Sequence, residues 1–600
     1  MKPGNPGVAQ ISRHFGNSRS SGNRTRYLLA AALCVCAFRP HPAEAKPASV
    51  QPSPVLLDAM TAELDRAMAD LGKPSDPLHA AKTPQSPYFL SYSASDVQSV
   101  GITAQFGALV SSQGNHSRSV DVLVRVGDEK LDNTHGNHRS SALNTVALPL
   151  NDDRRAIQRS LWWATNEGYG NALHNYLQVK TETQVRAKEE DSSPDFSREP
   201  AQVAIHPPAP APAVNASQWE QRMRSLSAVF RSYPEIYSNL VSLQVNNETR
   251  YFVSSEGARV VTPHRLARII VYAGTRAEDG MDLFRARTFE AETADGLPAQ
   301  PALEAAVRQL AISLEQLRKA PVTEPFDGPA ILSGRAAAVF FHEVLGHRLE
   351  GQRQRGNDEG QTFTRDVGKA ILPDFLSVAD DPTRQIFDGT YLSGYYQFDD
   401  EGQPSKRVDL ISDGVLETFL MSRLPIADFA SSNGHGRAQP GRMPTGRQGN
   451  LIVSSTRSVP DAQLRSMLLA EAKKQGKPYG LLFEDISSGF AVTTRNMPQA
   501  FQVLPLVVYR VYVDGRPDEL VRGVSIVGTP QAALSRIAAT GTRREVFNGE
   551  CGAESGSVAV SAVAPAMLVR EIETQRQPQG TSRQPILPMP AATDVPGGTH

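Results

Sequence analysis

AAAVFFHEVLGHRLEG, residues 336–351, is the stretch on which the interpretation of this chain depends. An apolar run ends in His342 and Glu343, and a second histidine, His347, follows. Two imidazoles with a carboxylate between them can form a metal site that has its own general base. The alternative interpretation is that both histidines are hydrogen-bonded inside a buried helix and bind nothing.

The two histidines are one position further apart than in the zinc-peptidase pattern HExxH, which places them on one face of a helix. In HExxxH the rings of His342 and His347 would point about 140° apart on a regular helix. They can share a metal ion only if the helix is distorted between them. A π-type bulge would re-aim one ring, and Gly346 is the position where the helix can unwind.

The chain has 600 residues, which is too long for one hydrophobic core and predicts at least two domains. Its hydrophobic fraction, 40%, is ordinary for a globular protein. The net charge of −1 gives no indication of nucleic acid or an anionic membrane surface as a partner.

Residues 1–45 have the pattern of a secretory signal peptide. Arg24 and Arg26 supply positive charge, the apolar stretch 27–38 is too short to span a bilayer as a helix, and residues 43–45 form an A-x-A cleavage site. We therefore expect a bacterial protein that is exported, periplasmic or secreted, without a stable membrane span after cleavage. The alternative is that the segment is retained as an anchor.

Cys551 is the only cysteine that remains after the expected cleavage, because Cys34 and Cys36 lie in the signal segment. It has no disulfide partner in its own chain. In an oxidising compartment a lone thiol is a liability unless it is buried or held as a thiolate by a metal. At this point the sequence leaves both options open.

Periodicity and composition divide the rest of the chain. We expect an N-terminal tether and amphipathic helix over 46–87, an N-terminal α+β domain over 88–320 with a Pro-rich insertion at about 188–217, a C-terminal domain over 321–573 and a disordered tail over 574–600.

Three local patterns make specific predictions. Trp162 and Trp163, in a helix expected over 152–177, are more often core or packing residues than functional ones. Residues 240–253 are expected to form a hairpin that turns at its two central asparagines. Ser333 is a good N-cap for the helix that carries the two histidines.

Four stretches of the sequence resemble the TldD/PmbA family of metallopeptidases, on its catalytic, TldD side. They are FVSSEG (252–257), HEVLGHRLEG (342–351), FDDEG (398–402) leading to DGVL (413–416), and ECGAESG (550–556). The resemblance extends from about Tyr88 to Val569.

The resemblance implies one zinc ion per chain, bound by His342, His347 and Cys551, with Glu343 as the general base. It implies an α+β fold of two domains: an N-terminal α/β-type domain of sheet and helices, and a C-terminal domain rich in antiparallel strands that carries the HExxxH helix. It also implies a homodimer, or a heterodimer with a paralogous subunit.

The expected function is hydrolysis of peptide bonds in unfolded or short peptides by a metallopeptidase. Asn433, His435 and Arg437, in a Gly-rich loop, are candidate substrate-binding residues, although such loops are more often simply solvated. Glu350 is expected to orient a ligand histidine. The alternatives are a non-catalytic binding or assembly protein pinned by zinc, and a metal-dependent amidase that acts on other amides.

Overall fold

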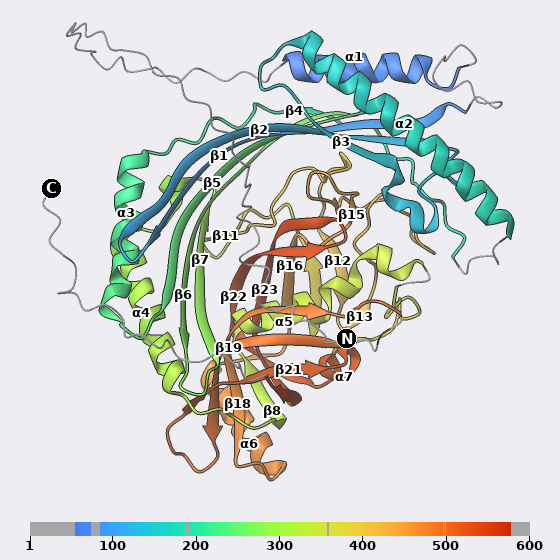
Figure 1. The fold of residues 1–600 in the computed structure, drawn as a ribbon. Coiled ribbons are helices and arrows are strands. Elements are labelled where there is room, and N and C mark those ends of the chain that lie inside the picture. Colours follow the sequence, from blue (N-terminus) through green and yellow to red (C-terminus); the bar gives the residue numbers. More distant parts are fainter. Residues whose placement is uncertain are drawn as a thin grey trace, which may run out of the picture. The chain divides into compact units, whose positions relative to one another are not determined.

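A computed structural model describes residues 54–73, 85–185, 191–356, 359–495, 497 and 500–577 (Figure 1). These residues belong to one unit of the chain, Val50–His600. They form a mixture of helices and strands with two large sheets, which confirms the predicted α+β fold class. The predicted signal peptide lies outside the described residues, and the predicted domain boundaries stay predictions.

The N-terminal sheet is built on long strands. β1 (Pro87–Gln105) and β2 (Ala108–Val126) form a hairpin. Its turn, Phe106-Gly107, has positive φ at both residues, as a type I′ turn requires. The sheet has the order β3-β2-β1-β5-β6-β4, with β7 paired to β6. Its other strands are β3 (Leu143–Ala147), β4 (Val203–Ile205), β5 (Ser238–Ser254), β6 (Arg259–Arg276) and β7 (Asp282–Ala291).

The predicted hairpin over residues 240–253 is wrong, because these residues lie within the single strand β5. Asn246 pairs with Ser99 of β1 on one side and with Leu266 of β6 on the other. With a neighbour on both edges, the two asparagines continue a central strand instead of turning.

Helices cover this sheet at the two ends of its long strands (Figure 1). α1 (Pro54–Asp70) and α2 (Arg154–Val185) pack over one end, and α3 (Ala216–Ala228) and α4 (Gln300–Lys319) pack over the other. The buried face of α2 includes Ile157, Leu161 and Ala164. Trp162 and Trp163 are 39% and 54% exposed, so they are not core residues: the phase of the helix turns them outward. That they are packing residues and not functional ones stays a prediction.

The C-terminal sheet has 12 strands, and most of its pairs are antiparallel. Its order is β13-β12-β9-β16-β23-β21-β19-β18-β8, and β17, β20 and β22 pair outside this path. The strands are β8 (Asp327–Leu332), β9 (Leu376–Asp380), β12 (Val408–Ser412), β13 (Val415–Leu416), β16 (Asn450–Ser455), β17 (Ser458–Val459), β18 (Tyr479–Ala491), β19 (Phe501–Tyr512), β20 (Glu519–Val521), β21 (Val524–Gly528), β22 (Ile537–Ala553) and β23 (Gly556–Arg576).

Shorter elements complete the described chain. They are the helices α5 (Gly334–Val344), α6 (Asp461–Lys474) and α7 (Pro530–Ser535), the strand pairs β10 (Ile386–Phe387) with β11 (Thr390–Tyr391) and β14 (Gly436–Arg437) with β15 (Thr445–Gly446), and the 3₁₀ turns η1 (Gly136–Ala142), η2 (Val229–Ser232), η3 (Ala294–Gly296), η4 (Gly346–Leu349) and η5 (Gly351–Gln354). No helix among the described residues is both long enough and apolar enough to span a membrane.

Residues 574–576, which the sequence places in a disordered tail, are the end of β23. Thr574 pairs with Ile526 of β21, and its hydroxyl accepts a hydrogen bond from the backbone N–H of Phe326 at 2.8 Å. The predicted tail therefore begins too early, because these residues complete the strand that pairs with β21. The rest of it, from residue 578, lies outside the described residues.

Candidate metal centre

α5 carries the first histidine on a helix that is buried on almost every side. Apolar residues on most of its faces join the main C-terminal core, and only Arg335 is partly exposed. The side chain of Ser333 accepts a hydrogen bond from the backbone N–H of Ala336 at 3.1 Å, which confirms the predicted N-cap.

The helix ends at Val344, and the chain continues as the 3₁₀ turn η4, which begins at Gly346. The predicted break between the histidines is confirmed in position, but it is a 3₁₀ turn and not a π-type bulge. A Cβ at residue 346 would lie 2.0 Å from Oε1 of Gln448, so glycine is what lets the chain pass this side chain. The buried guanidinium of Arg348 donates to the freed carbonyls of Glu343 and Val344 at 3.2 and 3.1 Å.

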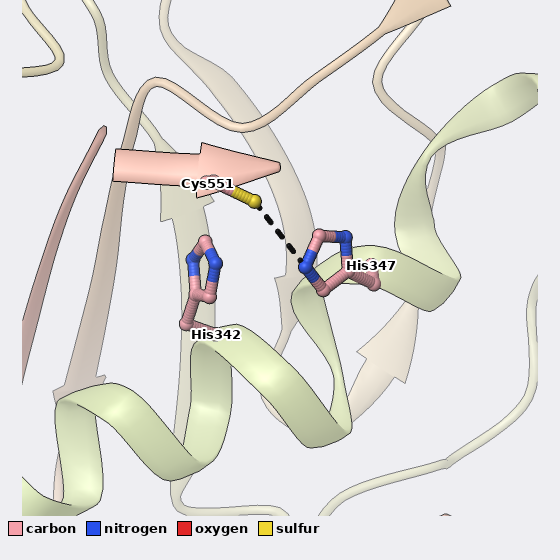
Figure 2. A group of neighbouring side chains, drawn as sticks. All are labelled: His342, His347 and Cys551. Carbon is pink, nitrogen blue, oxygen red and sulfur yellow. Dashed lines mark hydrogen bonds between the residues drawn. The ribbon is translucent and has the colours of Figure 1, made fainter. Parts of the chain in front are cut away.

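The break brings both imidazoles to one place, where Cys551 meets them (Figure 2). The ring centroids of His342 and His347 are 5.0 Å apart, and the rings are inclined by 73°. Cys551 comes from β22, and its Sγ lies 3.3 Å from Nε2 of His347. One ligand atom from each residue lies within 4.8 Å of the other two, and all three side chains are buried.

This donor set fits a zinc ion. Typical Zn–N and Zn–S bond lengths place nitrogen and sulfur ligands about 3.5 Å apart around a tetrahedral ion, close to the distance between Cys551 and His347. Nδ1 of His342 is buried without a hydrogen-bond partner among the described residues. Such a group normally has a partner. Two imidazoles and a thiolate are ligands that zinc prefers.

Charges around Cys551 favour the form that binds metals. Burial by itself raises the pKa of this thiol, but His347 and His342 outweigh burial and hold the pKa well below its usual range. These charges therefore favour the thiolate over the thiol. The thiolate, and not the thiol, is the metal ligand.

Glu350 contacts His347, one of the two histidines that it is expected to orient. Its Oε1 lies 3.1 Å from Nδ1 of His347, so Nε2 is the ring atom left for a metal. Burial raises the pKa of Glu350, but the charges of His347, Arg353 and Arg447 outweigh burial and lower it to about 2. Glu350 is thus an anion at any ordinary pH.

Arg447 links Glu350 to the strand that carries the thiolate. Its side chain is fully buried, and its Nε lies 3.4 Å from Oε1 of Glu350. Its guanidinium donates to the carbonyl of Cys551 at 2.6 Å and to the hydroxyl of Ser555 at 2.8 Å. This role could not be predicted from the sequence, because Arg447 lies in a loop without periodicity.

Glu343 lies beside the three candidate ligands but is not one of them. Its Oε2 is 3.9 Å from Nε2 of His347, and the residue is 8% exposed. Gly489 of β18 packs against it: a Cβ there would lie 2.7 Å from Cγ of Glu343. A carboxylate in this position can reach a water molecule or an amide held next to the ligand atoms.

The three candidate substrate-binding residues make internal bonds. Asn433 binds backbone groups of residues 419–421 through its amide, and His435 is completely buried. The guanidinium of Arg437 donates to the carbonyl of Gln448 at 2.6 Å. These bonds hold the loop together, and a contact with substrate stays a prediction.

Comparison with known proteins agrees with this geometry. Residues 326–576 match the family model described as "PmbA/TldA metallopeptidase C-terminal domain". Curated relatives are named metalloproteases or TldD homologues. This match and these names support membership of the TldD/PmbA family.

The individual relatives of this chain are distant. It is 25% identical over 350 residues to a metalloprotease of Methanocaldococcus jannaschii, a match that covers 57% of this chain and 68% of the relative. It is 24% identical over 250 residues to a "zinc metalloprotease TldD homolog" of Saccharolobus solfataricus, which covers 41% of this chain and about half, 51%, of that one.

The fold also has a solved counterpart. The structure of TldE from Thermococcus kodakarensis superposes with a TM-score of 0.53 at 13% identity and covers 81% of this chain and 97% of its own. At this identity the likeness concerns the fold alone.

Proposed function

We propose that this chain is a zinc-dependent peptidase that hydrolyses peptide bonds in unfolded or short peptides, with Glu343 as its general base. The observation that carries the proposal is the convergence of His342, His347 and Cys551 from two distant segments beside the carboxylate of Glu343. The family supports a metallopeptidase in general, and the remaining details are our own proposal.

Three ligands favour a catalytic ion over a structural one. Structural zinc is usually held by four protein ligands, whereas catalytic zinc has three and leaves one position for water or substrate. Within the described part of the chain, the metal-binding group contains two histidines and one cysteine. A zinc ion held there would supply Lewis acidity, which polarises a carbonyl and makes water more acidic.

The side chains then have separate tasks. Glu343 accepts a proton from the attacking water and delivers it to the leaving amine. Glu350 keeps the Nδ1 proton of His347 in place, and Arg447 keeps Glu350 and the Cys551 segment together. Burial of the three ligand side chains restricts the access of bulk water to this chemistry.

Export and assembly are part of the proposal. The pattern of residues 1–45 supports a periplasmic or secreted enzyme, which would act on peptides outside the cytoplasm. Curated relatives named TldD and a structural relative named TldE support a second subunit, either another copy or a paralogue.

The variant Glu343→Gln tests the chemistry. Purified protein is assayed with a peptide library, and its zinc is measured by elemental analysis. We expect Glu343→Gln to keep its zinc and to lose about 10²- to 10⁴-fold in rate, since a general base contributes this much. Glu417→Gln, an exposed carboxylate of the same domain, is the control and keeps full activity. Full hydrolysis by Glu343→Gln would refute the assignment of the base.

The choice of substrate distinguishes an amidase from the proposed peptidase. Cleavage of other amides, without cleavage of any peptide in the library, would replace the peptidase by an amidase with the same site. Zinc without any hydrolysis would favour the binding or assembly protein.

A further inference from the structure

Arg353 lies where three segments around the metal centre meet. It belongs to η5, which follows the helix of the two histidines, and it is 9% exposed. Each nitrogen of its guanidinium donates a hydrogen bond to a different segment. Nε donates to Oε2 of Glu350 at 2.7 Å, Nη1 donates to the hydroxyl of Thr493 at 2.9 Å, and Nη2 donates to Oε2 of Glu554 at 3.0 Å.

The first contact connects Arg353 to a candidate ligand. Glu350 is completely buried, and its other oxygen, Oε1, lies 3.1 Å from Nδ1 of His347. The two oxygens of a carboxylate are rigidly linked, so a donor held at Oε2 sets the direction in which Oε1 faces. Arg353 therefore fixes the ring of His347 through Glu350, in the way that outer hydrogen-bond partners commonly hold metal ligands.

The second contact reaches the segment that carries the thiol. Glu554 lies in the turn between β22 and β23, three positions after Cys551. Its Oε1 accepts a further hydrogen bond from Nε2 of Gln352 at 2.8 Å. Two neighbouring residues of η5 thus hold this turn, and with it the end of β22 on which Cys551 lies.

The third contact reaches the strand behind the proposed general base. Thr493 comes just after the end of β18, and Gly489 of that strand packs against Glu343. A hydrogen bond at Thr493 therefore restrains this end of β18. Glu359 adds a carboxylate at 3.6 Å from Nη1 of Arg353, which is beyond hydrogen-bond distance.

We infer that Arg353 is a positioning residue of the metal centre: it sets the position of His347 relative to Cys551 without touching a metal ion or a substrate. Through Thr493 it also restrains the strand behind Glu343. The inference deepens the proposed function and rests on its zinc site. The task requires donors that point in three fixed directions, and lysine, with one ammonium on a flexible stem, cannot replace the planar guanidinium.

The alternative is that Arg353 stabilises the fold and does nothing more, and Arg355 provides the matched control. Arg355 is also buried, and it pairs with Asp195 at 3.0 Å. Its other hydrogen bonds go to the carbonyls of residues 193, 194 and 425, which lie outside the segments that Arg353 joins. Removal of either guanidinium leaves a buried carboxylate without this partner, so Arg353→Met and Arg355→Met should both unfold at lower urea concentrations than the wild type.

The zinc Kd separates the two roles. It is measured on the full chain by competition with a chelator, and Co²⁺ bound in place of zinc reports the metal–thiolate bond by its absorption spectrum. We expect Arg353→Met to raise the zinc Kd by about 10- to 100-fold, the usual effect of losing an outer partner of a metal ligand, and to change the cobalt spectrum. Arg355→Met should leave the zinc Kd and the cobalt spectrum unchanged.

Two further variants keep the test decisive if Arg353→Met does not fold. The side chain of Glu554 is 40% exposed, so Glu554→Gln should fold, and we expect it to raise the zinc Kd and to change the cobalt spectrum in the same direction. Arg353→Lys keeps the positive charge but lacks the planar fork, so its zinc Kd should be raised at least tenfold.

Three results would overturn the inference. They are a wild-type zinc Kd in Arg353→Met and Glu554→Gln, an equally raised Kd in Arg355→Met, and a wild-type Kd in Arg353→Lys. Each of them leaves the proposed peptidase intact. A wild-type chain that binds no zinc would refute the zinc site itself, and with it both the inference and the proposed function.

Discussion

Cys551 is the proposed ligand whose replacement tests the metal site most directly. A serine hydroxyl is a poor zinc ligand compared with a thiolate, so Cys551→Ser should lose most of its bound zinc. Elemental analysis of this variant beside the wild type measures the effect. His174→Ala, at an exposed histidine outside the metal-binding group, should keep its zinc. A full complement of zinc in Cys551→Ser would contradict the ligand assignment.

Gly346 is the residue that permits the break in the helix. In Gly346→Ala the new methyl group would meet Gln448, so we expect a loss of about 1–3 kcal/mol in the free energy of unfolding, as overpacking in a core causes. Zinc affinity should fall with it, since the break aims His347 at Cys551. Urea unfolding and a zinc titration measure the two effects. Gly101→Ala, where a Cβ meets nothing within 4 Å, is the matched control.

At the scale of elements, the loop over residues 398–405 contains Glu401, whose carboxylate destabilises the folded state at neutral pH. Burial raises the pKa of Glu401 from 4.5 to about 7, although Arg423 opposes the shift. The folded state therefore binds this proton more tightly than the unfolded chain. Glu401 therefore contributes most to the stability of the folded state below pH 4.5, and this contribution should be lost as the pH rises towards 7.

Glu401→Gln should reduce this decline. Ionisation of Glu401 in the wild type should lower the free energy of unfolding by on the order of 3 kcal/mol between pH 4.5 and 7. Glutamine cannot ionise, so the variant lacks this loss. Urea unfolding at several pH values between 4.5 and 8 gives the slope for both proteins, with Glu417→Gln as the control. Equal slopes in the wild type and Glu401→Gln would show that Glu401 does not titrate in this range.

At the scale of the whole molecule, Arg423 joins the C-terminal half of the chain to segments of the N-terminal half. It is 1% exposed, its guanidinium donates to the carbonyl of Ser197, and it pairs with Glu256 at 2.8 Å. It also lies over the rings of Phe89 and Phe196, at 5.0 and 4.0 Å. Phe196 and Ser197 belong to the Pro-rich insertion, so this part of the insertion is packed against Arg423 although the insertion has the composition of a linker.

Arg423→Met should leave the carbonyl of Ser197 and the carboxylate of Glu256 without this partner. We expect a loss of about 2–4 kcal/mol in the free energy of unfolding, together with faster proteolysis near residue 197. Arg465→Met, which breaks the exposed pair with Asp518, should cost less than about 1 kcal/mol. Similar losses in both variants would mean that Arg423 does not join these segments.

The sequence predicted those features that depend on local chemistry. The N-cap at Ser333, the break at Gly346 and the role of Glu350 follow from neighbours in the chain. The contacts of Arg447 and Gln448 could not be predicted, because they depend on a loop that meets α5 only in the folded state. Trp163 faces outward, and β5 continues through Asn246 instead of turning, for a related reason: the phase of a helix and the pairing of a strand depend on the rest of the fold.

The distance along the chain between the ligands gives an order to events during synthesis. Cys551 follows His347 by 204 positions and leaves the ribosome long after both histidines. A nascent polypeptide therefore displays two imidazoles without their thiolate and cannot yet close the site. If the chain is a peptidase, its activity is withheld until Cys551 has been synthesised, which spares the growing chain and its neighbours.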